Sequence, residues 1–235
     1  MTATSFLRRI CQITPIDADD IDILRSLPWT TVKVKRHREI YKTGERPGSA
    51  YAIESGWAAR CGFRSDGSRR ITSLMVPGDF CGLPAFTREP FDDALIALVD
   101  CEIVRIQTDA LAVALKASPA IARAFWMSKL IDEAVLRMWL LNSKDALQSL
   151  AHLLCELHAR TSPIGEVKTG SLIVPMTQDE IGDVLGITSV HANRMLKQLR
   201  EEGLIEKTQS GVRIPSVETL REFCAFSPQY LHLAE

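Results

Sequence analysis

Apolar and polar positions alternate with different periods in three successive zones of the chain. In the first zone, Val32 and Val34 alternate with lysines, and turn sequences such as Ser55-Gly56 and Pro77-Gly78-Asp79 separate short apolar runs. A two-residue period predicts half-buried strands, and turns of this kind predict hairpins between them. We therefore expect a small closed barrel. Its strands should cover residues 32–34, 51–53, 57–63, 71–76, 94–99 and 103–106.

The second zone lacks glycine throughout residues 83–163, which favours long helices. Ser118-Pro119 has the chemistry of a helix start, and apolar residues then recur every 3.5 positions on average. This repeat predicts the seam between two helices that lie side by side. A second apolar surface, which includes Phe125 and Trp139, leaves open that the helix packs only on its own barrel. The predicted seam residues are Ala124, Met127, Ile131, Ala134, Met138 and Leu141.

The third zone contains a pattern typical of a helix-turn-helix. An amphipathic helix over residues 145–160 comes first, and Thr177 with Glu180 then forms a capping box that begins a short helix. Gly186 can end that helix in a left-handed conformation, and Thr188 can cap the next one. Residues 203–214 resemble a small hairpin, or wing. The second helix of such a motif enters the DNA major groove, and the alternative is an ordinary helical hairpin with a solvated basic face.

The outer face of that second helix is basic. Arg194, Lys197 and Arg200 recur every three residues without an acidic residue between them, which suits contact with DNA phosphates. Arg194 is the best candidate for a bidentate contact to guanine, and the residues at the start of the helix can reach base edges. The predicted DNA-contacting residues are Thr177, Thr188, Ser189, Val190, His191, Asn193, Arg194 and Lys197.

Composition narrows the class of protein further. The 235 residues carry 28 basic and 29 acidic side chains, and 46% hydrophobic residues suffice for one large or two modest domains. The near-neutral total excludes a disordered polyelectrolyte, but it does not exclude nucleic acid, because a binding surface is local. We find no secretion signal, no apolar run of about 20 residues and no Cys-x-x-Cys pair. We therefore expect a cytoplasmic protein with reduced thiols.

Enzymatic chemistry has little support in the sequence. His37 is the only histidine before His152, so a histidine-rich metal site in the barrel is excluded, and we predict no metal ligands. No nucleophile–base set or phosphate-binding glycine loop is present. Asp92 and Asp93 are adjacent, but neighbouring residues of a strand point to opposite faces. We predict no catalytic residue and no enzyme activity.

The chain as a whole resembles the Crp/Fnr superfamily of bacterial transcription regulators, from about Ile21 to Ile214. The resemblance implies an α+β fold with a double-stranded β-helix (β-roll) sensor at residues 1–117, a dimerisation helix at 118–143 and a winged helix-turn-helix at 144–235. It also implies a homodimer on palindromic operators and contact with RNA polymerase. The most specific stretch is 177–205; further matches are Gly44-Glu45, Gly56-Trp57, Asp66-Gly67-Ser68-Arg69-Arg70-Ile71, Pro77-Gly78-Asp79-Phe80 and residues 151–157.

Departures from the family pattern bear on the effector. Family members that bind cyclic AMP have a Glu after a Gly and an Arg about ten residues later, whereas here Leu83 and Pro84 follow Gly82 and the later position is Asp92-Asp93-Ala94. An aspartate repels a phosphate, so we do not expect cyclic AMP in the usual pose. The effector is therefore unknown. The expected pocket residues are Gly78, Phe80, Cys81, Gly82 and Leu83.

The sequence has few residues that match other cofactors or other functions. Only Cys11 precedes Cys61, so the cysteine cluster of the iron–sulfur members is missing. A haem with His37 or a cysteine as ligand remains an alternative, as does a redox role for Cys61, Cys81 or Cys101. The recognition helix has Val190 where many relatives have a glutamate. A cyclic-nucleotide-binding subunit of an enzyme or channel would have the pocket and lack the recognition helix, which is the reverse of this sequence.

Overall fold

A computed structural model describes residues 4–46, 48–81, 89–142, 145–164, 172, 174–208 and 211–233. The chain forms two compact units. Among the described residues, the β-roll unit comprises 4–63 and Ser73–Asp132, and the helix-turn-helix unit comprises Arg64–Thr72 and Glu133–Leu233. The boundary at Asp132 lies within a long helix, α4 (Pro119–Leu141). The three-part division expected from the sequence stays a prediction.

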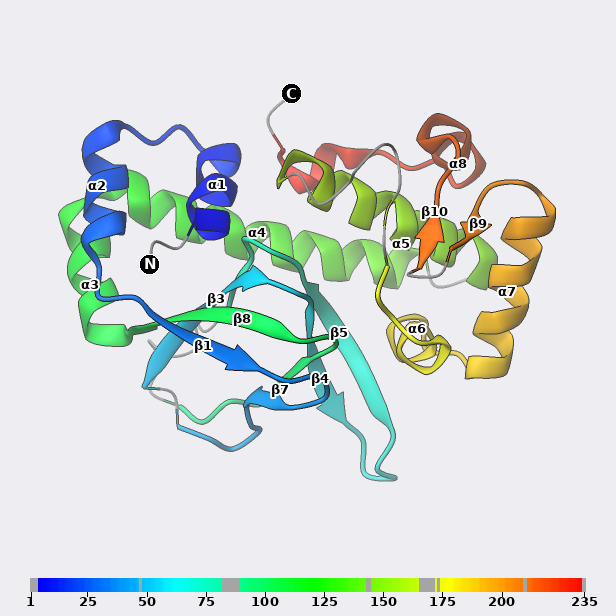
Figure 1. Cartoon of the computed structure of the whole chain (residues 1–235), viewed down its shortest axis with the longest axis horizontal. Coiled ribbons are helices and arrows are strands. Elements are labelled where there is room, and N and C mark those ends of the chain that lie inside the picture. Colours follow the sequence, from blue (N-terminus) through cyan, green and yellow to red (C-terminus); the bar gives the residue numbers. More distant parts are fainter. Residues whose placement is uncertain are drawn as a thin grey trace. The chain divides into compact units, whose positions relative to one another are not determined.

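Two antiparallel sheets form the β-roll, in the strand orders β1-β8-β3-β6 and β2-β7-β4-β5. Figure 1 shows β1, β8 and β3 side by side. Strands were predicted at six of these places; β2 and β6 have only three and two residues, too few for a periodic signal. The bounds are β1 Thr30–Val34, β2 Glu39–Tyr41, β3 Ser49–Ser55, β4 Ala58–Phe63, β5 Arg69–Met75, β6 Phe80–Cys81, β7 Ala94–Ala97 and β8 Cys101–Gln107.

A turn at Gly56 shows why glycine is needed between β3 and β4. Its φ is 81°, in the left-handed region, and an added Cβ would lie 2.5 Å from the Asp100 carbonyl oxygen. Both the conformation and the close approach exclude a side chain. The interior of the roll is an apolar cluster around Tyr41, Ile53, Cys81 and Phe91.

Three helices in the β-roll unit were not predicted: α1 (Thr4–Ile13), α2 (Ala18–Ser26) and α3 (Thr108–Ala117). Phe6 of α1 is fully buried, and its ring centroid lies 5.5 Å from that of Trp29 and 5.6 Å from those of Phe80 and Phe125. Burial of such rings is worth about 1.5–3 kcal/mol each. This aromatic cluster joins α1 and the first part of α4 to one sheet of the roll.

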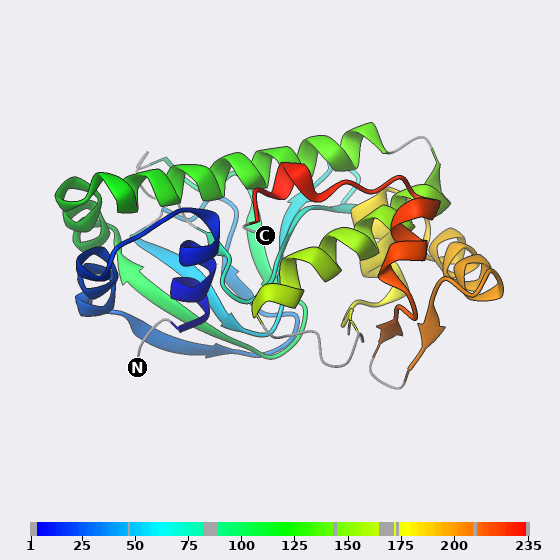
Figure 2. The same ribbon diagram turned by 90° about the horizontal axis from the view of Figure 1, so that it is seen from above.

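The long helix α4 begins where the sequence predicts, because the Ser118 hydroxyl accepts a hydrogen bond from the Ile121 amide at 3.0 Å. The predicted seam residues lie in three environments. Ala124 and Ala134 are buried within the chain, and Leu141 is 67% exposed. Met127, Ile131 and Met138 are half-buried. Figure 2 shows α4 as one uninterrupted helix.

The helix-turn-helix unit contains α5 (Ala146–Thr161), α6 (Gln178–Leu185), α7 (Ser189–Glu201) and α8 (Val217–Phe223). Short 3₁₀ helices follow α5 at Ser162–Ile164 and α8 at Pro228–Leu231. Asp145 caps α5 by accepting bonds from Leu147 and Gln148. The predicted wing is present: β9 (Glu206–Lys207) pairs antiparallel with β10 (Val212–Arg213). In Figure 2, both wing strands lie beside α8.

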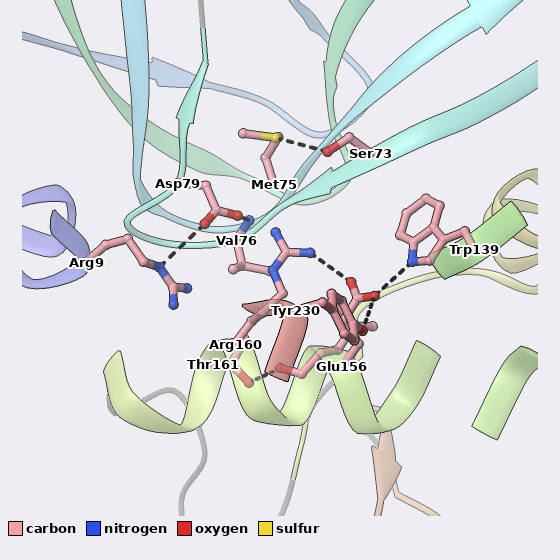
Figure 3. A network of polar contacts seen from close by, with 11 residues as sticks. Arg9, Ser73, Met75, Val76, Asp79, Trp139, Glu156, Arg160, Thr161 and Tyr230 are labelled. Carbon is pink, nitrogen blue, oxygen red and sulfur yellow. Dashed lines mark hydrogen bonds and ion pairs between the residues drawn. The ribbon is translucent and has the colours of Figure 1, made fainter. Parts of the chain in front are cut away.

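A buried carboxylate links three separate segments of this unit. Glu156 of α5 is fully buried, and one of its oxygens accepts hydrogen bonds from the Trp139 indole at 2.9 Å and the Tyr230 hydroxyl at 3.0 Å. Arg160, one turn later, forms an ion pair with the other oxygen at 3.1 Å, as Figure 3 shows. Burial raises the pKa of Glu156, and these donors oppose that effect. The network fixes the end of α4 and the C-terminal segment against α5.

We expect His152 of α5 to make the unit sensitive to acid. The ring is 4% exposed, between Phe226 and Tyr230, and burial lowers its pKa to about 4. The unfolded chain therefore binds more protons than the folded chain between about pH 6.5 and 4, so stability falls as pH falls through that window. Urea unfolding should show a loss of about 2 kcal/mol at pH 5 relative to pH 7.5. That His152 contribution should vanish in His152→Gln, and an unchanged pH dependence in the variant would contradict it.

Two negative findings concern the described part of the chain. No single helix there is both long and apolar enough to cross a membrane; only α3 and α4 taken together, with a bend of 118° between them, have the length and composition. Within the same residues, no three His, Cys, Asp or Glu side chains gather as metal ligands would.

Candidate nucleic-acid interface

The start of α6 has the capping box that the sequence predicts. The Thr177 hydroxyl accepts from the Glu180 amide at 3.2 Å, and the Glu180 carboxylate accepts from the Thr177 amide at 2.7 Å. Gly186 ends α6 with a φ of 73°, and its amide donates to the Gly182 carbonyl at 2.7 Å. Thr188 then caps α7 by accepting from the His191 amide at 3.2 Å. These caps fix where α7 begins and which of its faces is exposed.

The turn between α6 and α7 is tighter than the sequence alone indicates. Gly182 lies inside α6, where a glycine usually weakens a helix. A Cβ at this position would lie 2.6 Å from the carbonyl oxygen of Ile187, which is a backbone atom that cannot rotate away. Gly182 therefore permits the close approach of the turn to α6. This role of Gly182 was not predicted, because a glycine within a helical pattern does not reveal which distant backbone atoms lie against it.

We expect Gly182→Ala to destabilise the chain by about 1–3 kcal/mol, although alanine is the better helix former. The reason is the contact with the Ile187 carbonyl, which must be relieved by opening the turn. Urea unfolding of the full chain measures the change.

Gly203→Ala is the control for this prediction. Gly203 has a φ of 71° with no atom within 4 Å of an added Cβ, so only the backbone conformation is strained there. It should cost about 1 kcal/mol and leave the α6–α7 turn unchanged. A Gly182→Ala protein as stable as the original would contradict the tight turn.

The outer face of α7 presents exposed side chains that can meet a groove. Val190 is 80% exposed, and Asn193, Arg194 and Lys197 are exposed as well. Ser189 and His191 are half-buried at the first turn of the helix. The opposite face is buried through Ala192, Met195, Leu196 and Leu199. Among the described residues, none forms a hydrogen bond or ion pair with the Arg194 guanidinium. Its five donors therefore point into solvent.

The capping hydroxyls of Thr177 and Thr188 can each still donate a hydrogen bond to a ligand. Thr177 and Thr188 are exposed, and each uses its oxygen as an acceptor for a backbone amide. A hydroxyl has a donor proton besides its acceptor lone pairs. Each threonine can therefore cap its helix and donate to a phosphate oxygen at the same time.

Two polar contacts hold side chains of this surface in place, and neither was predicted from the sequence. The side-chain amide of Gln178 in α6 donates to the side-chain oxygen of Asn193 in α7 at 3.0 Å. This bond fixes the orientation of the Asn193 side chain. Lys197 lies 3.5 Å from Glu201, with both side chains at least 65% exposed. Exposed ion pairs of this kind contribute only about 0–1 kcal/mol. The Lys197 ammonium group can therefore leave Glu201 and pair with a DNA phosphate at little cost.

Arginines of the β4–β5 hairpin add charge beside the turn of the motif. The Arg69 guanidinium forms an ion pair with Asp183 of α6 at 2.7 Å. Arg64, Arg69 and Arg70 line a groove that also includes Gly186, Thr188 and His191. Burial lowers the pKa of Arg70. The hairpin tip is thus part of the helix-turn-helix unit. Arg69 and Asp183 are 114 positions apart in the sequence, so no local pattern indicates their contact.

The expected effector-pocket residues lie in different environments. Cys81 is in the interior cluster of the roll, whereas Phe80 faces the aromatic cluster with Phe6 and Phe125. Gly78 has a φ of 90°, and an added Cβ would lie 2.8 Å from both Arg9 and Ser5 of α1. Gly82 and Leu83 lie outside the described residues. Of the three expected pocket residues that the structure describes, Cys81 alone belongs to the interior cluster, because neighbouring strand residues alternate in direction.

Fold and interface together define a regulator that binds DNA through a winged helix-turn-helix and carries a β-roll. Residues 31–118 match the cyclic nucleotide-binding domain family, and residues 148–223 match the Crp-like helix-turn-helix domain family. The chain belongs to the Crp/Fnr superfamily of transcription regulators.

Curated relatives and solved structures agree with this assignment. The chain is 27% identical over 213 residues to "Transcriptional activator protein FnrA" of Stutzerimonas stutzeri, covering 88% of this chain and 86% of the relative. It is 24% identical to "Transcriptional regulatory protein btr" of Bordetella pertussis, covering 94% and 91%. The structure of FixK2 from Bradyrhizobium japonicum has a TM-score of 0.76 at 24% identity, covering 86% of this chain and all of that one. The two curated relatives are named as transcription regulators, and the likeness to FixK2 shows the same fold.

Proposed function

We propose that two copies of the chain bind an inverted-repeat operator, with one α7 in each of two successive major grooves. The observation that carries the proposal is the exposed Arg194, which has no partner among the described residues and lies on a helix whose start is fixed by the Thr188 cap and the close turn at Gly182. A guanidinium free of internal partners matches the O6 and N7 acceptors of guanine. In this proposal, a dimer bound in the cytoplasm alters transcription through contact with RNA polymerase, as the family resemblance implies.

The surface supports a division of roles among the α7 residues. Val190 is an apolar side chain 80% exposed, which suits contact with a thymine methyl group. Ser189, His191 and Arg194 lie near enough to the helix start to reach base edges. The proposal assigns contacts with the sugar–phosphate backbone to Asn193, Lys197, Thr177 and Thr188. Phosphate contacts set the orientation of the helix, and base contacts set the sequence preference.

Exposed apolar side chains on α4 support the dimer. Trp126, Leu140 and Leu141 are each at least 65% exposed, and Leu130 is 39% exposed. Apolar side chains gathered in this number on one helix mark an interaction surface. On a helix with 100° per residue, Trp126 and Leu130 fall beside Met127, Ile131 and Met138, on the side where the predicted seam residue Leu141 lies. The proposed seam therefore extends from the predicted positions onto this neighbouring stripe.

The interior of the roll supports an effector other than cyclic AMP. Tyr41 stacks on Phe91 with ring centroids 3.9 Å apart, and its hydroxyl donates to Asp93 at 3.1 Å. A carboxylate faces this interior, where a bound phosphate would be repelled. His37, the alternative haem ligand, is exposed in the turn between β1 and β2 and so does not support a haem.

Selection from random double-stranded DNA tests the proposal. The full chain should enrich an inverted repeat whose half-site centres are about 34 Å, one helical turn, apart. Enrichment should fall steeply with salt, because phosphate contacts release counterions. Recovery of no sequence preference at ordinary ionic strength, with and without extract of the native host, would overturn the proposal.

A further inference from the structure

Two cysteines of the helix-turn-helix unit lie in contact. The Cys155 and Cys224 sulfur atoms are 3.8 Å apart, although the residues are 69 positions apart in sequence. Cys155 is fully buried in α5, and Cys224 is 9% exposed at the end of α8. Cys11 is exposed, and Cys61, Cys81 and Cys101 are buried in the β-roll unit. Both thiols of the pair are free in this structure.

The surroundings make the two thiols unequal. The Cys224 thiol donates to the Leu220 carbonyl at 3.1 Å, which leaves its sulfur lone pairs free to accept the Cys155 proton. Donation from Cys155 lowers the pKa of Cys224, and the same bond together with burial raises the pKa of Cys155. The Arg221 guanidinium adds positive charge near Cys155 and opposes part of the rise in the pKa of Cys155. Cys224 is thus both nearer to solvent and easier to ionise.

We propose that Cys155 and Cys224 form a reversible disulfide when the protein meets a hydroperoxide. The Cys224 thiolate attacks one peroxide oxygen and breaks the O–O bond, giving a sulfenic acid; with hydrogen peroxide, the hydroxide released takes up the thiol proton as water. The Cys155 sulfur then attacks the sulfenic sulfur and expels its hydroxyl as a second water. Two thiols lose two electrons, the peroxide gains two, and an external thiol reverses the reaction.

The bond would constrain the whole recognition surface. Residues 156–223 lie between the two cysteines and include α6, α7 and both wing strands. An S–S bond is about 2.0 Å long, so the two sulfur atoms, now 3.8 Å apart, must approach each other by a little under 2 Å. A closed loop of this size restricts the unfolded chain. Oxidation is therefore expected to raise the thermal midpoint by about 5 °C or more.

Peptide mapping of the full chain tests the proposal. A Cys11→Ser protein, which removes the exposed thiol, is treated with hydrogen peroxide, alkylated in denaturant and digested without reductant. We expect a linked pair of peptides that contain Cys155 and Cys224, lighter by two hydrogens than the separate peptides and released by dithiothreitol. Alkylated Cys155 and Cys224 after full oxidation of Cys11 in the parent protein would overturn the proposal.

The thermal midpoint gives a second readout with matched variants. Peroxide should raise the midpoint in the Cys11→Ser and Cys11→Ser/Cys81→Ser proteins but not when Cys224→Ser is added. If Cys224→Ser fails to fold, Cys155→Ala serves instead, and the peptide map is decisive by itself. A midpoint that rises equally without Cys224 or Cys155 would contradict the assignment. None of these readouts needs DNA, so their failure is distinct from failure of the proposed operator binding.

Discussion

Replacing Arg194 with alanine is expected to remove most of the preference of the protein for its selected inverted repeat. A bidentate arginine–guanine contact discriminates by about 1–3 kcal/mol, and a dimer makes the contact twice. The ratio of specific to random-sequence affinity should therefore fall by about 30-fold or more. Fluorescence anisotropy with the repeat and with shuffled DNA at one salt concentration measures that ratio. The fold should be unaffected, because the side chain is exposed on the outer face of α7.

Lys197→Ala is the matched control for this effect, since Lys197 lies one turn further along the same face of α7. A lost phosphate contact weakens binding to both DNAs nearly equally and reduces the slope of log affinity against log salt by about 0.9 per contact. An Arg194→Ala protein that keeps its sequence preference would show that another residue reads the bases.

Trp126→Glu is expected to turn the dimer into monomers. The side chain is 65% exposed on α4, so the substitution leaves the core of the chain intact and places a charge in the proposed seam. Sedimentation should show the mass of one chain where the parent shows two. Affinity for the inverted repeat should fall by about 100-fold or more, because a single α7 loses the gain from binding both half-sites together.

Val113→Glu is the control for the seam. Val113 is 68% exposed on α3, so its change introduces the same charge at a similarly exposed apolar residue away from α4. That variant should remain dimeric. A dimeric Trp126→Glu protein would place the interface elsewhere on the molecule.

Local sequence signals predicted most of the elements that form the interface. The Thr177–Glu180 capping box, the left-handed Gly186 and the Thr188 cap each act within four residues, and all three are present. Ser118 and Asp145 likewise begin α4 and α5 as expected. Such signals are readable because the backbone groups they satisfy are close in the sequence.

Contacts between segments far apart in the sequence could not be predicted from local sequence patterns. Trp139, Glu156 and Tyr230 meet in one network, although no local period relates them. The approach of Ile187 to Gly182 and the meeting of Cys155 with Cys224 depend equally on how helices pack. The α4 seam shows a related limit: a 3.5-residue period gives the spacing of a face but not which of two adjacent stripes the chain itself covers.

Binding to a repeat with altered spacing shows whether one dimer reads both half-sites at once. Inserting about five base pairs between the selected half-sites turns one of them to the opposite side of the duplex without changing any contacted base. If two α7 helices of one dimer read the two half-sites together, affinity should fall by about 100-fold, and an insertion of about ten base pairs should restore part of it. Equal affinity for the original repeat and the repeat with five inserted base pairs would show that one dimer does not read the two half-sites together.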